Sequence, residues 1–382
     1  MSEHTIQELK TRQALPLEVK VLMTKQRIRE WIDEFGEDGC YISFSGGKDS
    51  TVLLHLVREI NPNIPAVFVD TGLEYPEIRE FVKTFENVDI IRPNMTFKEV
   101  INSYGYPFIS KEVSGAIEET RRFFSKIQKE RGIEIPDGKQ LEFLLDAYEK
   151  GIDFGYEHRL PIRALQMIGK VPHKRNGVLT GEISKTYDKS KWGFAMDAPV
   201  KISNQCCNIM KKAPTKKYAK ETGRYAHFTG MMAEESHLRE SMWLRYGCNA
   251  FESKHPASNP MSFWTEQDVL NYIRINQIKI ASVYGDIEID YEALEQAKGQ
   301  VTINDVLGLP ETFPLRTTGC KRTGCMFCGF GCHLNNDDRF TRMKETHPKQ
   351  YDYIMRPKEQ GGLGYKEVID WINEHGNLNI RY

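Results

Sequence analysis

The chain has 382 residues, of which 40% are hydrophobic and 27% charged, and its formal net charge is −1. This composition suffices for one large domain or two ordinary ones with a buried core, and it lacks the overall basic charge that indicates a nucleic-acid-binding protein. Residues 1–20 contain no continuous apolar stretch typical of a secretory signal, and nowhere do about eighteen apolar residues run together. We therefore expect a cytoplasmic protein without a membrane span. Local basic pairs such as Lys211–Lys212 leave a nucleic-acid acceptor open without indicating one.

The most informative stretch is a glycine-rich loop near the N-terminus. A helix predicted near residues 15–35 precedes a short strand at 41–44, and a second helix follows the loop because apolar residues from Val52 to Ile60 share one helical face. Glycines let the backbone approach an anion, the helix N-terminus offers N–H groups, and Lys48 adds a full positive charge. The pattern predicts a phosphate-binding loop, with Lys48 as a candidate catalytic residue. Its residues are Ser45, Gly46, Gly47, Lys48, Asp49 and Ser50.

Spacing identifies the kind of phosphate loop. The P-loop of common ATPases requires a glycine where this chain has Ile42, and it places Ser or Thr after the lysine where this chain has Asp49. The dinucleotide-binding fingerprint does not fit either. The stretch S-G-G-K-D-S resembles instead the pyrophosphate loop, or PP loop, of the ATP-pyrophosphatases.

Alternating strands and helices predict a parallel sheet. Strands are expected at residues 66–69 and 88–91, with a helix at 76–85 between them, so the fold class is α/β with a Rossmann-like sheet. Ligands bind at the carboxyl ends of such strands, where Asp70, Thr71 and Gly72 follow the second strand. Asp70 could accept from a ribose or hold Mg²⁺ as a second candidate catalytic residue, and Thr71 could donate to a phosphate. The alternative is an Asx turn that caps the next helix.

The remaining elements complete two predicted domains. Residues 111–169 read as a helical insertion with helices near 112–131 and 140–168, and strands ending in Thr-Gly are expected at 177–181 and 225–230. The second of these strands leads to a helix at 234–246, so Gly230, Ser236 and Arg239 are candidate nucleotide-binding residues. We expect a nucleotide-binding domain over residues 1–279. A Cys-rich region over residues 280–382, ending in a helix at 365–374, would complete a metal site.

Clustered cysteines predict metal or redox chemistry, because a disulfide framework does not suit a reducing compartment. Cys325 and Cys328 form a C-x-x-C pair that can place two sulfurs on one metal. Either Cys206 and Cys207 join this pair, or Cys320 and Cys332 do. We favour a [4Fe–4S] cluster over zinc, because adjacent cysteines suit the separate iron corners of a cubane better than one tetrahedral ion.

Together these motifs resemble the phosphoadenosine-phosphosulfate reductase family, and within it the cluster-bearing adenosine-5'-phosphosulfate reductase branch. The resemblance runs from Tyr41 to about His333. It implies that the PP loop binds ATP or adenylyl sulfate and that Cys206, Cys207, Cys325 and Cys328 hold a [4Fe–4S] cluster. Two departures are visible: no cysteine follows Cys332, where the reductases carry a nucleophilic cysteine, and Met232 stands in place of the arginine in the family's Thr-Gly-x-Arg pattern.

The predicted function is therefore adenine-nucleotide-dependent sulfur or redox chemistry, with a sulfur donor or reductant protein as a possible partner. One alternative is an ATP-dependent sulfur transferase that acts on a nucleic acid, since the PP loop and cluster also look like those of such enzymes. The other is a nucleotide-responsive binding module without turnover. The oligomeric state is not predicted.

Overall fold

The computed structural model describes residues 4–253, 256–297, 313–335 and 337–382. The chain forms two compact units. The first contains Met1–Pro93 and Lys212–Cys325, and the second contains Asn94–Lys211 and Met326–Tyr382. These units are defined by contacts within the chain, and the functional division expected between residues 279 and 280 stays a prediction.

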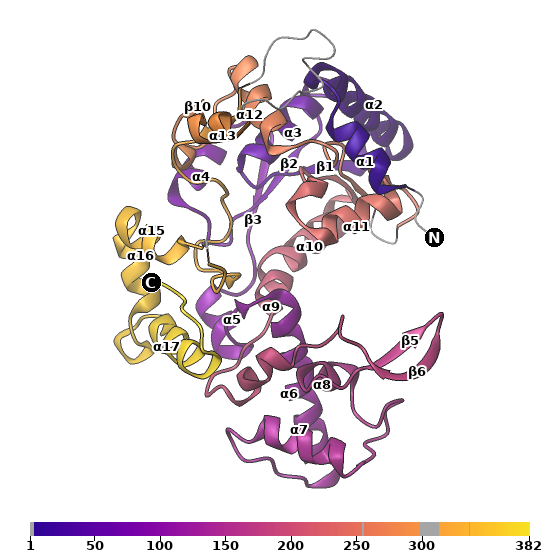
Figure 1. Cartoon of the computed structure of the whole chain (residues 1–382). Coiled ribbons are helices and arrows are strands. Elements are labelled where there is room, and N and C mark those ends of the chain that lie inside the picture. Colours follow the sequence, from indigo (N-terminus) through magenta and orange to yellow (C-terminus); the bar gives the residue numbers. More distant parts are fainter. Residues whose placement is uncertain (1–3, 254–255, 298–312, 336) are drawn as a thin grey trace. The chain divides into compact units, whose positions relative to one another are not determined.

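The first unit is built on a mostly parallel sheet with the strand order β3-β2-β1-β7-β9-β8. Neighbouring strands from β3 to β9 run parallel, and only β8 pairs antiparallel with β9. Figure 1 shows β1, β2 and β3 side by side, as their register requires. The predicted α/β fold with a parallel sheet is confirmed. The strands are β1 (Cys40–Ser43), β2 (Ala66–Val69), β3 (Val88–Ile91), β7 (Ala226–Phe228), β8 (Asn249–Ala250) and β9 (Ala257–Ser258).

Helices cover this sheet with apolar faces. In α3, Val52, Leu53, Leu56 and Val57 are buried, as the sequence pattern predicts, and α3 packs against α2 and α12. The helices of the first unit are α1 (Ile6–Gln13), α2 (Leu17–Phe35), α3 (Lys48–Arg58), α4 (Pro76–Val82), α10 (Ala213–Thr222), α11 (His237–Tyr246), α12 (Glu266–Ile275) and α13 (Tyr291–Ala297). Three 3₁₀ turns, η1 (Glu37–Gly39), η4 (Ala233–Glu235) and η5 (Ser282–Tyr284), and the antiparallel pair β10 (Ile287–Ile289) and β11 (Leu315–Thr317) complete it.

The second unit is mainly helical. Its longest helix, α6 (Lys111–Arg131), begins at Ser110, whose hydroxyl accepts from the Val113 N–H, and ends at Gly132, which adopts φ +65°. Helix α6 packs against α8 and the short strand β4. The other described helices are α5 (Phe97–Ser103), α7 (Gln140–Glu149), α8 (Ile162–Met167), α9 (Gln205–Cys207), α15 (Arg339–Thr346), α16 (Pro348–Met355) and α17 (Tyr365–Gly376). Further helical segments are η2 (Ser190–Asp197), η3 (Asn208–Lys212) and η6 (Lys358–Gln360), and η3 runs into α10. The strands are β4 (Phe108–Ile109), β5 (Pro172–Arg175), β6 (Val178–Ile183) and β12 (Gly329–Phe330).

Two predictions for the second unit differ from the structure. The helix expected over residues 140–168 is interrupted between α7 and α8, where Gly151 and Gly155 adopt φ +64° and +82°, a conformation that ends a helix. The strand expected at 177–181 is present as β6, but among the described residues it pairs with β5 in an antiparallel hairpin and does not join the parallel sheet. Its Thr-Gly therefore does not lie at the edge of the parallel sheet.

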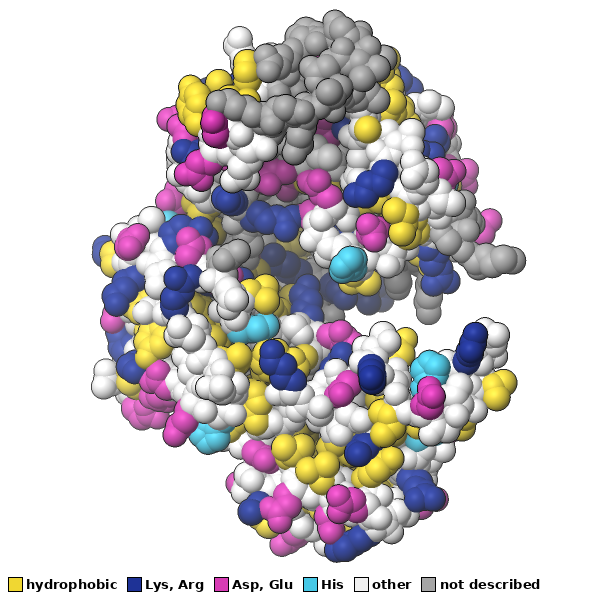
Figure 2. All heavy atoms as spheres, viewed as in Figure 1, with side chains coloured by type: hydrophobic (Ala, Val, Ile, Leu, Met, Phe, Trp, Pro, Cys, Tyr) yellow, Lys and Arg dark blue, Asp and Glu magenta, His cyan; other side chains and the backbone are white. Residues whose placement is uncertain are grey.

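The β5–β6 hairpin is exposed and carries both apolar and charged side chains. Asn176 and Gly177 connect its strands with positive φ angles, which suits a tight two-residue turn. Figure 2 shows Lys or Arg, His and hydrophobic side chains together on this ribbon. Val178 and Leu179 are 69% and 53% exposed, and Lys174 pairs with Glu157 at 2.9 Å.

None of the described helices combines the length and the apolar composition needed to cross a lipid bilayer.

Candidate nucleotide site

The PP loop joins β1 to α3 and is held in shape by its own hydroxyl groups. The Ser45 and Ser50 hydroxyl oxygens lie 3.0 Å apart, and the Ser50 hydroxyl also donates to the Gly47 carbonyl at 2.9 Å. The Ser45 N–H donates to the Ser50 hydroxyl at 3.2 Å. In this arrangement the two serines stabilise the loop rather than offering free donors. Their predicted contact with a ligand stays a prediction.

Two glycines of the site are required by close packing. Gly46 adopts φ +71°, and a Cβ there would lie 2.8 Å from methyl groups of both Ile78 and Val82 on α4. A Cβ at Gly230 would lie 3.0 Å from the Asp49 carbonyl oxygen at the start of α3. Gly230 is therefore brought next to the PP loop, as the sequence predicts, and both positions bring backbone close to the N-terminus of α3.

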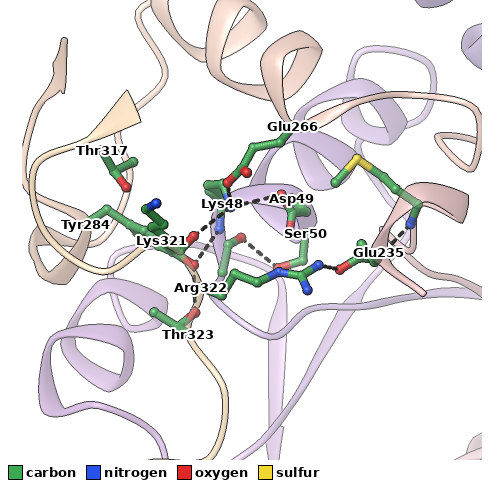
Figure 3. A network of polar contacts seen from close by, with 12 residues as sticks. Lys48, Asp49, Ser50, Glu235, Glu266, Tyr284, Thr317, Lys321, Arg322 and Thr323 are labelled. Atoms are coloured by element: carbon green, nitrogen blue, oxygen red, sulfur yellow. Dashed lines mark hydrogen bonds and ion pairs between the residues drawn. The ribbon is translucent and has the colours of Figure 1, made fainter. Parts of the chain in front are cut away.

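Lys48 is almost fully buried at the first position of α3, with 2% of its side chain exposed. Its Nζ donates to the Lys321 carbonyl at 2.9 Å and lies 3.1 Å from Glu266 and 3.7 Å from Asp49 (Figure 3). Its backbone N–H donates to the Tyr284 hydroxyl at 3.1 Å. Both the charge and the N–H group that the sequence assigns to phosphate binding thus meet oxygen atoms of distant residues.

Besides Glu266 on α12, these partners are Tyr284 in η5 and Lys321 in a segment that starts at the last residue of β11. We call this segment, residues 317–323, the covering segment. The Thr323 hydroxyl pairs with the Tyr284 hydroxyl at 2.6 Å, and both lie within 3.3 Å of the position of a Cβ at Gly47. Backbone bonds from Gly319 to Tyr284 and from Cys320 to Val283, each 2.9 Å, fix the segment against η5. The covering segment therefore forms one wall of the site.

Asp49 is a buried carboxyl group in this site. Burial raises its pKa, while Lys48 and Arg322 lower it and Glu266 raises it further. Its Oδ1 is buried and accepts no hydrogen bond among the described residues, although Lys48 Nζ lies 3.7 Å away. An additional cation or donor would satisfy this oxygen.

A second group of charges lies on η4 and α11. Glu235 forms ion pairs with both Arg239 and Arg322, and it also accepts from the Met232 N–H at 2.9 Å. Met232, which the resemblance places at the position of an arginine, is 2% exposed and therefore buried in the protein. Burial lowers the pKa of Arg239, as does the charge of Arg322, so two guanidinium groups are crowded around one carboxylate.

Asp70 follows β2 at the carboxyl edge of the sheet, next to β1. Its oxygens accept from Arg79 at 3.1 Å and from Arg92 at 3.2 Å, and Oδ1 lies 3.3 Å from the Gly72 N–H. The Asx turn is present, but Asp70 does not cap α4, whose N-cap is Tyr75. A ribose or Mg²⁺ would compete with the two exposed arginines, so that role stays a prediction.

The neighbouring candidates have local partners. Thr71 donates to Glu74 at 2.7 Å, which leaves its predicted phosphate contact untested. Ser236 is exposed and acts as the N-cap of α11, accepting from the Arg239 N–H at 3.4 Å. A role of Ser236 in nucleotide binding also stays a prediction.

Cysteines gather in the second unit. The Cys206 and Cys207 sulfurs lie 4.0 Å apart in α9. The hydrogen bond with Cys206, helped by Lys111 and Lys211, lowers the pKa of Cys207 to about 6 against the opposing effect of burial. Burial raises the pKa of Cys328, and the Cys207 charge raises it further, which places the two thiols in one neighbourhood.

The other candidate ligands are divided between the units. Burial raises the pKa of Cys332 to about 12, with a contribution from Cys328. Cys320 belongs to the first unit, where Thr317 donates to its carbonyl at 3.0 Å. Cys325 is the last residue of the first unit and Met326 begins the second, so the C-x-x-C pair spans the point where the chain passes between them.

Cysteine thiolates are the ligand type that iron–sulfur clusters use, so the residue type at this place suits such a cluster. Among the described residues, no group of three or more His, Cys, Asp or Glu side chains is arranged to hold a metal ion. Cys328 nevertheless interacts with both Cys207 and Cys332, and burial raises the pKa of Cys328 even though Arg339 and Lys111 partly offset this effect. Nearby cations favour the thiolates that a cluster requires.

The fold and this site define an α/β protein that carries a PP loop at the carboxyl edge of a parallel sheet. A family model described as the phosphoadenosine phosphosulfate reductase domain matches residues 39–131 and 156–329. The chain belongs to the phosphoadenosine phosphosulfate reductase family.

Similar proteins match only in part. Phosphoadenosine 5'-phosphosulfate reductase from Serratia proteamaculans is 37% identical over 91 residues, which cover 22% of this chain and 37% of that protein. An uncharacterised protein from Methanocaldococcus jannaschii is 41% identical over 71 residues, or 17% of this chain and 15% of its own. The matched region thus spans about a third or less of these relatives' length. A crystal structure of phosphoadenylyl-sulfate reductase from Candida auris covers 68% of this chain and 82% of its own at 13% identity, with a TM-score of 0.34, too low to support an inference.

Several contributors to the site were not predicted from sequence. Tyr284 and Glu235 carry no motif that would mark them. Lys321 and Arg322 form a basic pair in a Thr- and Gly-rich stretch just before Cys325, and that pair was the available signal.

Replacing Gly46 by Ala is expected to lower the free energy of unfolding by about 2–5 kcal/mol, because positive φ costs about 1–2 kcal/mol and overpacking about 1–3 kcal/mol. Gly72→Ala is the matched control, since Gly72 also has φ +74° but no atom within 4 Å of its Cβ position. The free energy of unfolding of Gly72→Ala should fall only by the cost of the positive φ angle. Urea unfolding checks both variants, and equal losses would contradict the packing argument.

Proposed function

We propose that this protein is an enzyme that binds ATP or adenylyl sulfate at the PP loop and uses it for sulfur or redox chemistry. The observation that carries the proposal is the buried Lys48 at the N-terminus of α3, beside Gly46 and Gly47, in a chain of the phosphoadenosine phosphosulfate reductase family. A buried cation next to helix N–H groups is suited to phosphate oxygens and poorly suited to a neutral ligand.

Each residue of the site then has a role. The Lys48 side chain and the backbone of Gly46 and Gly47 would hold phosphate oxygens, in competition with Tyr284 and the Lys321 carbonyl. Asp70, at the end of the neighbouring strand, would contact the ribose or a Mg²⁺ ion that neutralises the phosphates. The Oδ1 of Asp49, which pairs with Lys48 Nζ at 3.7 Å but accepts no hydrogen bond among the described residues, offers a further acceptor at the same edge.

The cysteines support a cluster-bearing branch of the family. We propose that Cys206, Cys207, Cys325 and Cys328 ligate a [4Fe–4S] cluster, with Cys320 and Cys332 as alternative ligands and zinc as the weaker alternative metal. When bound, such a cluster would supply thiolate-ligated iron for sulfur or electron transfer. The protein's own contribution is the cationic surroundings of these thiols from Lys111, Lys211 and Arg339.

A second candidate is an ATP-dependent sulfur transferase whose acceptor is a nucleic acid. The exposed hairpin of β5 and β6 favours it, because a two-stranded ribbon fits a nucleic-acid groove and cations contact phosphates. Arg175 and Lys185 are exposed there, and Lys191 lies over the Trp192 ring at 5.0 Å. A binding module without turnover is the third reading of the same site.

Lys48→Met keeps the bulk of the buried side chain but removes its charge, so ATP affinity is expected to fall at least about tenfold, equivalent to about 1.4 kcal/mol. Calorimetric titration measures this, with Lys10→Met on the exposed face of α1 as the control that should bind like wild type. Equal affinity of the Lys48 and Lys10 variants would contradict the proposed phosphate contact.

An assay of turnover distinguishes the three candidate functions. In measurements made without oxygen, the first proposal predicts release of AMP or pyrophosphate from ATP with a small sulfur donor or acceptor, or release of AMP and sulfite from adenylyl sulfate with a dithiol reductant. Stimulation only by tRNA or duplex DNA would assign the acceptor to the second candidate. Silence with both nucleotides and every acceptor, despite measurable ATP binding, would favour the binding module.

Protein purified without oxygen is expected to be brown, with broad absorption near about 400 nm. Cys207→Ala should lose most of the iron, whereas Cys40→Ala, a buried thiol on β1, should retain it. Colourless protein with stoichiometric zinc would contradict the cluster. Full iron content in Cys206→Ala would overturn this ligand set in favour of Cys320 and Cys332.

A further inference from the structure

We propose that Arg322 is a phosphate-binding residue of the nucleotide site and acts there together with Arg239. This inference rests on the proposed nucleotide site at the PP loop. It adds a residue from the covering segment, outside the motifs that identify the family, and it assigns to that residue the recognition of the anionic part of the ligand.

The backbone around Arg322 is fixed to the PP loop on both sides. The carbonyl of Lys321 accepts from Lys48 Nζ at 2.9 Å. On the other side, the Thr323 hydroxyl pairs with the Tyr284 hydroxyl, which accepts from the Lys48 N–H. Arg322 therefore lies between two residues that are tied, directly or through Tyr284, to the lysine of the phosphate loop, as Figure 3 shows.

The charge of Arg322 acts on this same site. It lowers the pKa of Asp49, which follows Lys48, and it lowers the pKa of Arg239 on α11. These effects decline with distance, so the Arg322 guanidinium is near both groups. Lys48, Arg239 and Arg322 form a group of three cations around the N-terminus of α3.

The carboxylate of Glu235 lies between the two arginines and shows that an anionic group can bind both of them. Its carboxylate has 10% of its side chain exposed and forms ion pairs with both Arg239 and Arg322. A phosphate group has the same hydrogen-bonding geometry toward guanidinium as a carboxylate, with more oxygens and more charge. The Arg239–Arg322 pair is thus already arranged as an anion-binding fork.

The exposed fractions of the two arginine side chains indicate which of them can move to contact a ligand. The Arg322 side chain is 56% exposed, whereas Arg239 is 35% exposed and anchored on α11. Arg322 can therefore leave Glu235 for a phosphate without uncovering a core.

The test compares Arg322→Gln with Arg316→Gln in the full-length chain. Arg316 on β11 is the matched control, because it is also an exposed arginine that pairs with a glutamate, Glu288 at 2.9 Å, and it lies outside the covering segment. Titration with ATP at constant salt should show at least about a tenfold weaker affinity for Arg322→Gln, and less than about a twofold change for Arg316→Gln. Arg322→Lys, which keeps the charge but not the two-pronged geometry, should fall between them.

Adenosine provides the second readout, since it lacks the phosphates. Arg322→Gln should bind adenosine as the wild-type chain does, because only the anion contact is lost. Equal ATP affinity of the two Gln variants would overturn the proposal, as would an equal loss of ATP and adenosine affinity. If the wild-type chain bound no ATP, or if Lys48→Met bound it unchanged, the proposed function itself would fail, which is a different result from failure at Arg322 alone.

Discussion

The site depends on the contact between Lys48 and residues far along the chain. The Lys48 N–H reaches Tyr284 across 236 positions, and its Nζ reaches Lys321 across 273. These bonds satisfy a helix N-terminus and a buried charge that would otherwise be costly to leave unpaired. They also hold the covering segment in contact with the PP loop, so the proposal that one ligand binds both segments follows from these bonds.

This arrangement explains several features that look unrelated in sequence. Gly46 allows α4, and Gly230 allows its own backbone, to pack close to the start of α3. Asp49 is buried there, and burial raises its pKa. Glu235 occupies the space between two arginines. The nucleotide site is therefore an assembly of charges that are paired within the protein and would be re-paired when an anion binds.

The parts of the fold and site that local chemistry determines could be predicted. The glycine-rich loop between β1 and α3 and the parallel strands β1 to β3 follow from glycine positions and hydrophobic periodicity. Contacts that depend on long-range pairing could not be predicted: nothing local indicates that Tyr284 meets Lys48, that Arg322 meets Glu235 or that Gly230 packs against Asp49. The strand expected at 177–181 is present as β6, but its partner could not be predicted for the same reason, because its residues suit a hairpin as well as a parallel sheet, and only tertiary pairing decides between them.

The central claim is that the PP loop and the covering segment bind one ligand together. Hydrogen–deuterium exchange of the full-length chain, with and without saturating ATP and Mg²⁺, tests it most directly. The account predicts slower exchange in residues 45–51 and in residues 317–323 at the same ligand concentration, because both segments contribute donors and acceptors to one site. Protection of only one segment, or of neither while ATP binds elsewhere, would contradict it.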